Sequence, residues 1–190
     1  RFGLPATPRG PLDHVMTTPS AVKLTDVGPR DGLQNEKTWV PTSVKIELVH
    51  RLQQAGLTSI EVTSCVSPKW VPQMADHREV MAGIARQSGV CYSVLVPNMK
   101  GFEAVAACYP DEIVVFAAAS EAFSQRNINC SIAASLERFR PVVSAALALG
   151  IRVRGALSCA VGCPYEGDVA PQQVGMLAQR MKELGVQHIG

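Results

Sequence analysis

A short pattern, in which a helix-like segment ends in glycine and passes into a β-branched or apolar segment, constrains the fold of this chain most. Gly56 ends one such segment, and Gly89-Val90, Gly150-Ile151 and Gly185-Val186 repeat the junction. Glycine suits the end of a helix because it adopts the left-handed conformation at little cost. The recurrence predicts alternating strands and helices, which is typical of a parallel sheet with helices outside.

The pattern predicts elements throughout the chain after a leader. Residues 1–20 are rich in proline and are expected to be a flexible leader. Pro141 is expected to kink or divide the helix that contains it. Strands are expected at 22–27, 57–64, 90–96, 112–117, 151–157 and from 186, and helices at 41–56, 73–86, 100–107, 132–148 and 171–184.

Two α/β architectures fit this alternation, a doubly wound sheet and a (β/α)8 (TIM) barrel. A doubly wound sheet gathers its site at one switch point, whereas a barrel brings the carboxyl ends of all strands to one mouth. We expect residues 21–190 to form an incomplete barrel of five βα units and the start of strand six. Polar residues follow nearly every predicted strand: Arg30 and Asp31, Glu61 and Ser64, Asn98, Ser120 and Glu121, and Ser158 and Cys159.

The composition argues against several classes of partner. Of the 190 residues 47% are hydrophobic and 18% charged, with a net charge of +2 and no cluster of basic residues, so neither nucleic acid nor membrane is expected. Six irregularly spaced cysteines favour reduced thiols over a disulfide scaffold. The bacterial cytoplasm is the expected compartment, with Met16 as a possible start. The alternative is the mitochondrial matrix, with residues 1–15 as the tail of a transit peptide.

The segment "GPRDG", residues 28–32, has two readings. By itself it is typical of a surface turn. Directly after a barrel strand, however, Asp31 would direct a carboxylate to the mouth, where a hard cation such as Mg²⁺ or Mn²⁺ could bind it. Arg30 could then stabilise an enolate or carboxylate oxygen.

A carboxylate inside an apolar strand is the next unusual feature. Glu61 either faces outward or forms a buried ion pair, for which Arg30 is an available partner, because an unpaired buried carboxylate is costly. Trp70 and Met74 are expected to pack. Asn127 and Asn129 could cap a helix or bind a ligand.

Cys159 and Cys163 are expected to be ordinary buried thiols. They form a C-x3-C pair, but the third cysteine that a cluster motif requires is absent, because residue 166 is glutamate. The four histidines lack ligand spacing.

Four motifs together resemble the hydroxymethylglutaryl-CoA lyase family. They are "VGPRDGLQNE", "SPKWVPQMAD", "RNINCSI" and "SCAVGCPYEG", and the likeness extends from Val22 to Gly190. The resemblance implies a (β/α)8 barrel with one divalent cation, Mg²⁺ or Mn²⁺, in a protein that is a homodimer at full length. The implied reaction is retro-Claisen cleavage of 3-hydroxy-3-methylglutaryl-CoA to acetyl-CoA and acetoacetate, in leucine degradation and ketone-body formation.

The resemblance also implies roles for individual residues. Asp31 matches the family's metal-binding aspartate, Arg30 its catalytic arginine and Glu61 its acidic active-site residue. The remaining family metal ligands would lie beyond residue 190, so residues 1–190 alone are expected to be inactive. Polar residues around the substrate correspond to Gln34, Lys37, Asn127 and Arg154.

One departure and two alternatives remain. Ala156 stands where family members often carry tyrosine, which leaves the shape of the acyl pocket open. The nearest alternative is a Claisen-condensing synthase that joins an acyl-CoA to a 2-keto acid. The other is a CoA-binding fragment without catalytic activity.

Overall fold

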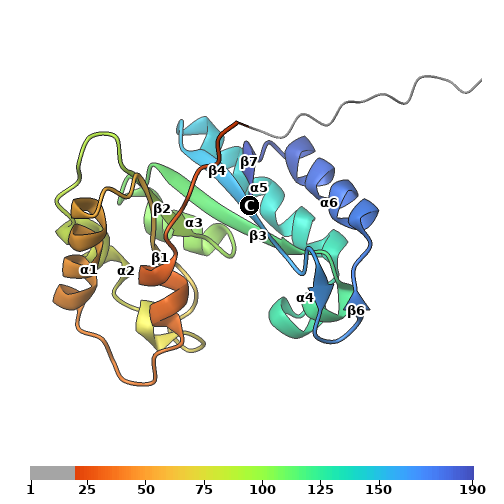
Figure 1. The fold of residues 1–190 in the computed structure, drawn as a ribbon, viewed down its shortest axis with the longest axis horizontal. Coiled ribbons are helices and arrows are strands. Elements are labelled where there is room, and N and C mark those ends of the chain that lie inside the picture. The colour runs from red at the N-terminus through yellow and green to blue at the C-terminus, as the bar shows by residue number, and fades with distance from the viewer. Residues whose placement is uncertain (1–19) are drawn as a thin grey trace, which may run out of the picture.

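The main sheet contains five parallel strands whose order across the sheet equals their order along the chain, β1-β2-β3-β4-β7. The computed structural model describes residues 20–190 (Figure 1). A doubly wound sheet would reverse its strand order at a switch point, and this sheet does not. The strands are β1 Ser59–Ser64, β2 Cys91–Leu95, β3 Glu112–Ala118, β4 Arg152–Ser158 and β7 His188–Ile189, and a separate hairpin pairs β5 Gly162–Cys163 with β6 Gly167–Asp168.

Helices cover the sheet along its length. In Figure 1, α1 and α2 lie beside β1, and α5 and α6 lie beside β4 and β7. Gly56, Gly150 and Gly185 follow the ends of α1, α5 and α6 as expected, with φ of 89°, 71° and 106°. Gly89 also has a positive φ, 82°, but it lies in a turn after α2 has already ended at Gly83. The helices are α1 Thr42–Gln54, α2 His77–Gly83, α3 Met99–Ala106, α4 Glu121–Ile128, α5 Ile132–Ala148 and α6 Pro171–Glu183, with short helical turns η1 Gly28–Gly32 and η2 Pro72–Met74.

The apolar core lies between the strands and these helices. Ile60, Ile113 and Val153 from the strands and Val49 and Val142 from the helices have no exposed surface. None of the helices formed by residues 20–190 combines the length and apolar character that a membrane span requires.

The prediction of a strand at 22–27 was wrong. Its only sheet pairing is a single bridge from Asp26 to Ile60, supported by hydrogen bonds of Asp26 with Ser59 and Glu61 at 3.0 and 2.8 Å. Val22 and Leu24 are 78% and 73% exposed. Within the described residues this segment has a neighbour on one side only and nothing on which its apolar side chains can pack. The predicted leader, residues 1–20, lies outside the described residues apart from Ser20.

Three further elements differ from the prediction. Residues 73–86 contain the turn η2 and the shorter helix α2, and both α4 and the β5–β6 hairpin were missed. Pro141 does not divide α5, which is continuous. The side chains of Pro141 and Glu137 lie on the exposed face of α5, where water can bind the carbonyl that loses its N–H partner.

A buried ion pair fixes η2 and α2 against α1. Lys45 is 3% exposed, and its Nζ donates to Asp76 Oδ1 at 2.7 Å and to the carbonyl of Gln73. Thr42 Oγ1 donates to the other oxygen of Asp76, also at 2.7 Å. The ring of Trp39 lies 4.3 Å from Nζ. The ammonium group of Lys45 in α1 therefore contacts η2, the start of α2 and the segment that carries Trp39.

The Asp76→Ala substitution tests that ion pair. It leaves the Lys45 ammonium buried without its carboxylate, so the free energy of unfolding should fall by about 3 kcal/mol. Urea denaturation measures the change. The control is Glu79→Ala, which removes an exposed carboxylate from the same helix and should change stability by less than about 0.5 kcal/mol. Equal effects of the two substitutions would contradict a structural role for the pair.

Candidate active site

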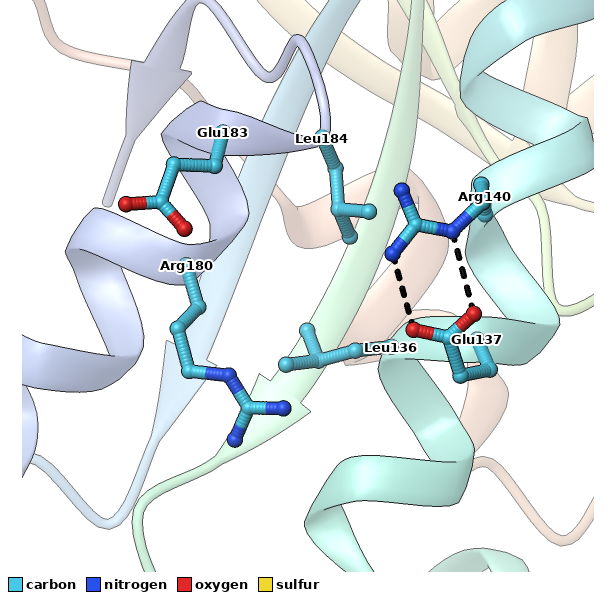
Figure 2. A pocket seen from close by; sticks show the side chains of 6 residues that line it. All are labelled: Leu136, Glu137, Arg140, Arg180, Glu183 and Leu184. Atoms are coloured by element: carbon cyan, nitrogen blue, oxygen red, sulfur yellow. Dashed lines mark hydrogen bonds and ion pairs between the residues drawn. The ribbon is translucent and has the colours of Figure 1, made fainter.

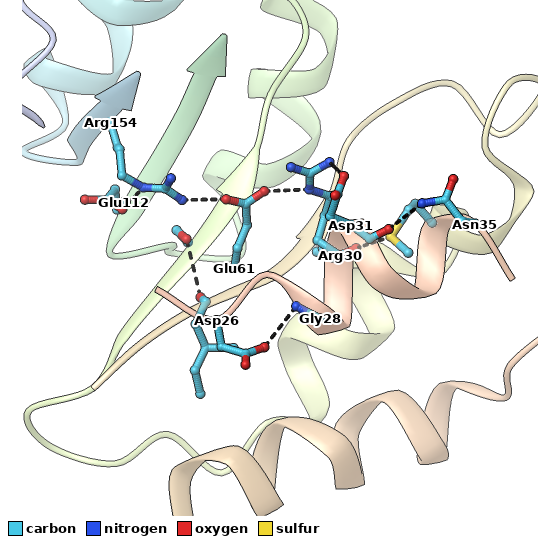
Figure 3. A network of polar contacts seen from close by, with 12 residues as sticks. Asp26, Gly28, Arg30, Asp31, Asn35, Glu61, Glu112 and Arg154 are labelled. Atoms are coloured by element: carbon cyan, nitrogen blue, oxygen red, sulfur yellow. Dashed lines mark hydrogen bonds and ion pairs between the residues drawn. The ribbon is translucent and has the colours of Figure 1, made fainter. Parts of the chain in front are cut away.

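A chain of ion pairs crosses the concave side of the sheet and joins η1 to strands β1, β3 and β4 (Figure 3). Arg30 Nη1 contacts Asp31 Oδ1 at 2.6 Å, and Arg30 Nε contacts Glu61 Oε1 at 2.5 Å. The other oxygen of Glu61 accepts from Arg154 Nη2 at 2.5 Å, and Arg154 Nε donates to Glu112 Oε1 at 3.0 Å. Both oxygens of Glu61 are therefore held by arginines.

The contact between Glu61 and Arg154 shows that the sheet is strongly curved. Glu61 lies in β1 and Arg154 in β4, three strands apart. In a flat sheet these strands would be about 14 Å from each other, at roughly 4.8 Å per neighbour. Their side chains meet at 2.5 Å because the sheet bends and its inner side chains converge. Curvature of this kind is a property of a barrel wall.

The two glutamates need their arginine partners because their carboxylates are buried. The side chains of Glu61 and Glu112 are each 1% exposed, and those of Arg30 and Arg154 are 14% and 13% exposed. Asp31, the last member of this series of ion pairs, is 53% exposed. Burial would lower the pKa of Arg154, but the hydrogen bonds and negative charges of Glu61 and Glu112 more than offset this and raise it. The guanidinium therefore stays charged, and each buried glutamate has a cation beside it.

The helical turn η1 brings Arg30 to this position. The carbonyl of Val27 accepts hydrogen bonds from the backbone N–H groups of Arg30, Asp31 and Gly32, at 3.1, 2.7 and 3.4 Å. Asp26 Oδ1 accepts from the N–H of Gly28 at 2.9 Å, and a Cβ on that glycine would lie 3.0 Å from the same oxygen. Residues 28–32 thus form a short helical turn that directs Arg30 toward Glu61. The interpretation of this segment as a plain surface turn was wrong.

Arg30 and Asp31 line a cavity of about 800 Å³. Gln34 and Asn127, two further predicted site residues, also line it, as does Asn129. Glu61 and Arg154 are not in the lining and lie behind Arg30. Lys37 is exposed and is likewise not part of the lining. The other lining residues are Val66, Trp70, Val71, Leu95, Pro97, Phe116, Phe123, Arg126, Ile128, Ala156 and Ser158.

Asn129 was expected to cap a helix or bind a ligand, and Met74 and Trp70 were expected to pack. Asn129 ends α4 in the left-handed conformation, with φ 51°, while Ser131 caps the start of α5. Met74 is buried as expected, but Trp70 is 83% exposed at the cavity, so the prediction that it packs was wrong. Within residues 20–190 no neighbouring element covers the loop after β1 that carries it.

All six cysteines are free. Burial raises the pKa of Cys65 to about 12, and burial with the nearby Cys163 raises that of Cys159. Cys163 is buried, and its Sγ lies 2.9 Å from Ser120 Oγ. Although burial alone would raise its pKa, hydrogen bonds from Ser120 and from two backbone N–H groups lower it. The described residues hold no group of three or more His, Cys, Asp or Glu side chains placed to bind a metal ion.

Two residues near the site were not predicted from the sequence. Glu112 pairs with Arg154, and its signal was a charged residue at the start of the apolar strand "EIVVFA". Arg126 lines the cavity from α4, a helix that the sequence reasoning missed.

A second cavity, of about 170 Å³, lies between α5 and α6 on the outside of the sheet (Figure 2). Leu136, Leu184 and four charged side chains line it, of which Glu137 and Arg140 pair with each other at 2.8 Å. It holds none of the predicted site residues.

Known proteins resemble this chain over most of its length. The chain is 58% identical over 170 residues to a 3-hydroxy-3-isohexenylglutaryl-CoA/hydroxymethylglutaryl-CoA lyase of Pseudomonas aeruginosa, covering 90% of this chain and 57% of that protein. It is 54% identical over 175 residues to the mitochondrial hydroxymethylglutaryl-CoA lyase of Bos taurus, covering 92% and 54%. The chain thus spans about half the length of the curated relatives it matches.

Solved structures of such lyases also have the fold of this chain. The crystal structure of hydroxymethylglutaryl-CoA lyase from Pseudomonas aeruginosa superposes with a TM-score of 0.87 at 57% identity, over 90% of this chain and 57% of that one. An Acinetobacter baumannii HMG-CoA lyase in complex with coenzyme A and 3-methylmalate superposes with a TM-score of 0.83 at 34% identity, over 88% and 54%. The HMGL-like family model matches residues 21–190. By sequence and by fold, this chain belongs to the HMGL-like family.

Proposed function

We propose that this chain supplies the Arg30 side of the active site of a hydroxymethylglutaryl-CoA lyase, which cleaves 3-hydroxy-3-methylglutaryl-CoA to acetyl-CoA and acetoacetate. One observation carries the proposal. A guanidinium fixed by a buried carboxylate lines a large cavity, in a chain 54–59% identical to relatives named as such lyases. A full site requires the length of those relatives, of which this chain spans 54% and 57%.

The reaction requires a fixed positive charge. Cleavage of the C2–C3 bond moves its electron pair to C2, and the thioester carbonyl oxygen becomes an enolate oxygen as the tertiary hydroxyl loses its proton. Arg30 Nε is bound to Glu61 and one Nη1 hydrogen to Asp31, so the Nη2 hydrogens remain for the enolate oxygen. A donor already held in place stabilises developing charge without reorganisation.

Glu61 and Arg154 act through Arg30 in this proposal. A carboxylate with both oxygens bound to guanidinium groups is poorly suited to accept a proton, so Glu61 is a positioning residue. Arg154 holds the second oxygen and prevents Glu61 from rotating away from Arg30.

Asp31 offers one ligand for a divalent cation, Mg²⁺ or Mn²⁺. It is the carboxylate that lines the cavity within the described residues, and its Oδ2 is free of the Arg30 contact. One carboxylate is a suitable part of a hard-cation site but does not complete one. A bound cation would polarise the hydroxyl and carbonyl oxygens of the substrate. The other ligands would come from the part of the family fold that this chain does not span.

Substrate contacts extend the proposal to the rest of the cavity. Gln34 and Asn127 line it and would bind polar atoms of the substrate. Ala156 also lines it, so its short side chain leaves room for the acyl group. Lys37 is exposed and does not line the cavity, so its contact with the substrate remains a prediction. A homodimer and a bacterial cytoplasmic or mitochondrial location remain predictions.

The alternatives have less support. The relatives described above are named as lyases rather than condensing synthases. Incubation with 3-hydroxy-3-methylglutaryl-CoA distinguishes the classes, because a lyase releases acetoacetate and a CoA-binding protein without activity does not.

The Arg30→Gln substitution tests the charge-stabilising role. In the chain completed to the length of its relatives, kcat should fall by roughly 10²-fold or more, the scale of losing a preorganised oxyanion donor. Acetyl-CoA release measures the rate, and cation binding should survive. Arg51→Gln, at an exposed arginine on α1, should leave kcat unchanged. Near-normal kcat in Arg30→Gln would refute the role.

The Glu61→Gln substitution separates positioning from proton transfer. If Glu61 holds Arg30, kcat should fall by about tenfold or more while the acidic limb of the pH profile of kcat/KM remains, because Glu61 is then not the proton acceptor that such a limb reports. Steady-state rates across pH measure both effects. Loss of that limb would show instead that Glu61 is the base.

The Asp31→Asn substitution tests the cation ligand. Affinity for Mn²⁺ should fall by roughly tenfold or more, because a neutral amide binds a hard cation more weakly than a carboxylate. Electron paramagnetic resonance of free Mn²⁺ measures this directly, and high Mn²⁺ should restore part of the activity. Asp168→Asn, at an exposed aspartate of β6, is the control. Equal affinities in wild type and Asp31→Asn would exclude Asp31 as a ligand.

A further inference from the structure

Arg126 lies on the wall of the same cavity, in the last turn of α4. Its guanidinium carbon is 4.1 Å from the centre of the Tyr165 ring. Asn127 and Asn129, which follow it in the sequence, line the cavity beside it. Neither the enolate-stabilising role of Arg30 nor the cation site of Asp31 involves this arginine.

Arg126 differs from Arg30 in having no carboxylate partner among residues 20–190. The charged residues of the lining are Arg30, Asp31 and Arg126. Arg30 forms ion pairs with Asp31 and with Glu61 behind it. A ligand that enters the cavity therefore meets a cation whose charge is not already compensated.

The β5–β6 hairpin holds this arginine in one orientation. Glu166 Oε1 accepts from the N–H of Ala122 at 3.1 Å, and Cys163 Sγ contacts Ser120 Oγ at 2.9 Å, so the hairpin is fixed to the start of α4. Tyr165 lies between these two anchors, with its ring against Arg126. A stacked guanidinium keeps its N–H edge free and directed, a geometry that matches the paired oxygens of a phosphate.

The position of α4 indicates which part of a ligand Arg126 would meet. Arg30 and Asp31 lie on η1, which contacts β1, whereas α4 contacts β3. Figure 1 shows these two segments on different sides of the molecule. A ligand whose reacting atoms lie at Arg30 must therefore extend across the cavity to reach Arg126. An acyl-CoA carries its phosphates far from the thioester and fits this separation of charges.

We propose that Arg126 binds a phosphate group of the CoA part of the substrate, and that Tyr165 positions it for this contact. The inference rests on the proposed thioester substrate of this site. A purely structural arginine at a helix C-terminus would stabilise the helix dipole but would not discriminate between ligands with and without phosphate.

Two thioesters that differ only in the nucleotide test the proposal. In the completed chain, Arg126→Gln should raise KM for 3-hydroxy-3-methylglutaryl-CoA roughly tenfold, the scale of losing a hydrogen-bonded charged contact, with kcat little changed. KM for the corresponding pantetheine thioester, which lacks the nucleotide, should not change. Arg126→Lys should recover part of the affinity, and Tyr165→Leu should show a smaller rise for the CoA ester only. Arg138→Gln, at an exposed arginine on α5, is the matched control.

Binding of free CoA, dephospho-CoA and pantetheine, measured by calorimetry, makes the outcomes separable. Weaker binding of CoA but not pantetheine to Arg126→Gln supports the proposal even if no thioester is cleaved, in which case the proposed function alone fails. Dephospho-CoA then shows whether the 3′-phosphate or the pyrophosphate is bound. An equal rise of KM for both thioesters would assign Arg126 to the acyl part or to structure and overturn the proposal, as would an unchanged KM for both.

Discussion

The bridge that Glu61 forms between two arginines is the interaction on which the site depends. It joins Arg30, before the first paired strand, to Arg154, in β4. Removing charges from water is costly, and a buried carboxylate is tolerated only when its partners and geometry are good. Here both oxygens are bound, so the cost is offset by two close cations. The same bridge requires the sheet to curve, because its two ends are three strands apart.

The curvature in turn explains how the cavity is shared among distant segments. Residues from η1, from the ends of β2, β3 and β4, and from α4 line one hollow, because strands in sequential order around a bent sheet direct their inner side chains to a common space. Arg30 and Arg126 thus line one cavity from elements that are almost a hundred residues apart. Their environments differ, since the first is compensated by carboxylates and the second is stacked on an aromatic ring.

Much of the fold followed from the sequence because the helix-glycine-strand junctions are local signals. The helix 132–148 was predicted with its observed bounds, and Arg30, Asp31 and Asn127 were placed at the cavity that they line. The segment 22–27 has a strand-like pattern, but strand formation also needs neighbours, which a pattern cannot supply. The helix α4 was missed because it is short and polar and follows β3 after only two residues. Trp70 was expected to pack on grounds of residue type, while its exposure depends on what surrounds the loop.

The sequential strand order has a consequence for biosynthesis. Each strand of the main sheet pairs with the one made before it, so a nascent chain can add strands one at a time from its N-terminal end. Each step closes a connection of 16 to 33 residues. The charge balance of the interior does not follow that order. Glu61 leaves the ribosome with only Arg30 as a partner, and Arg154 follows 93 residues later. Until Arg154 is made, water must bind the second oxygen of Glu61. The sheet can exclude that water only once Arg154 takes its place.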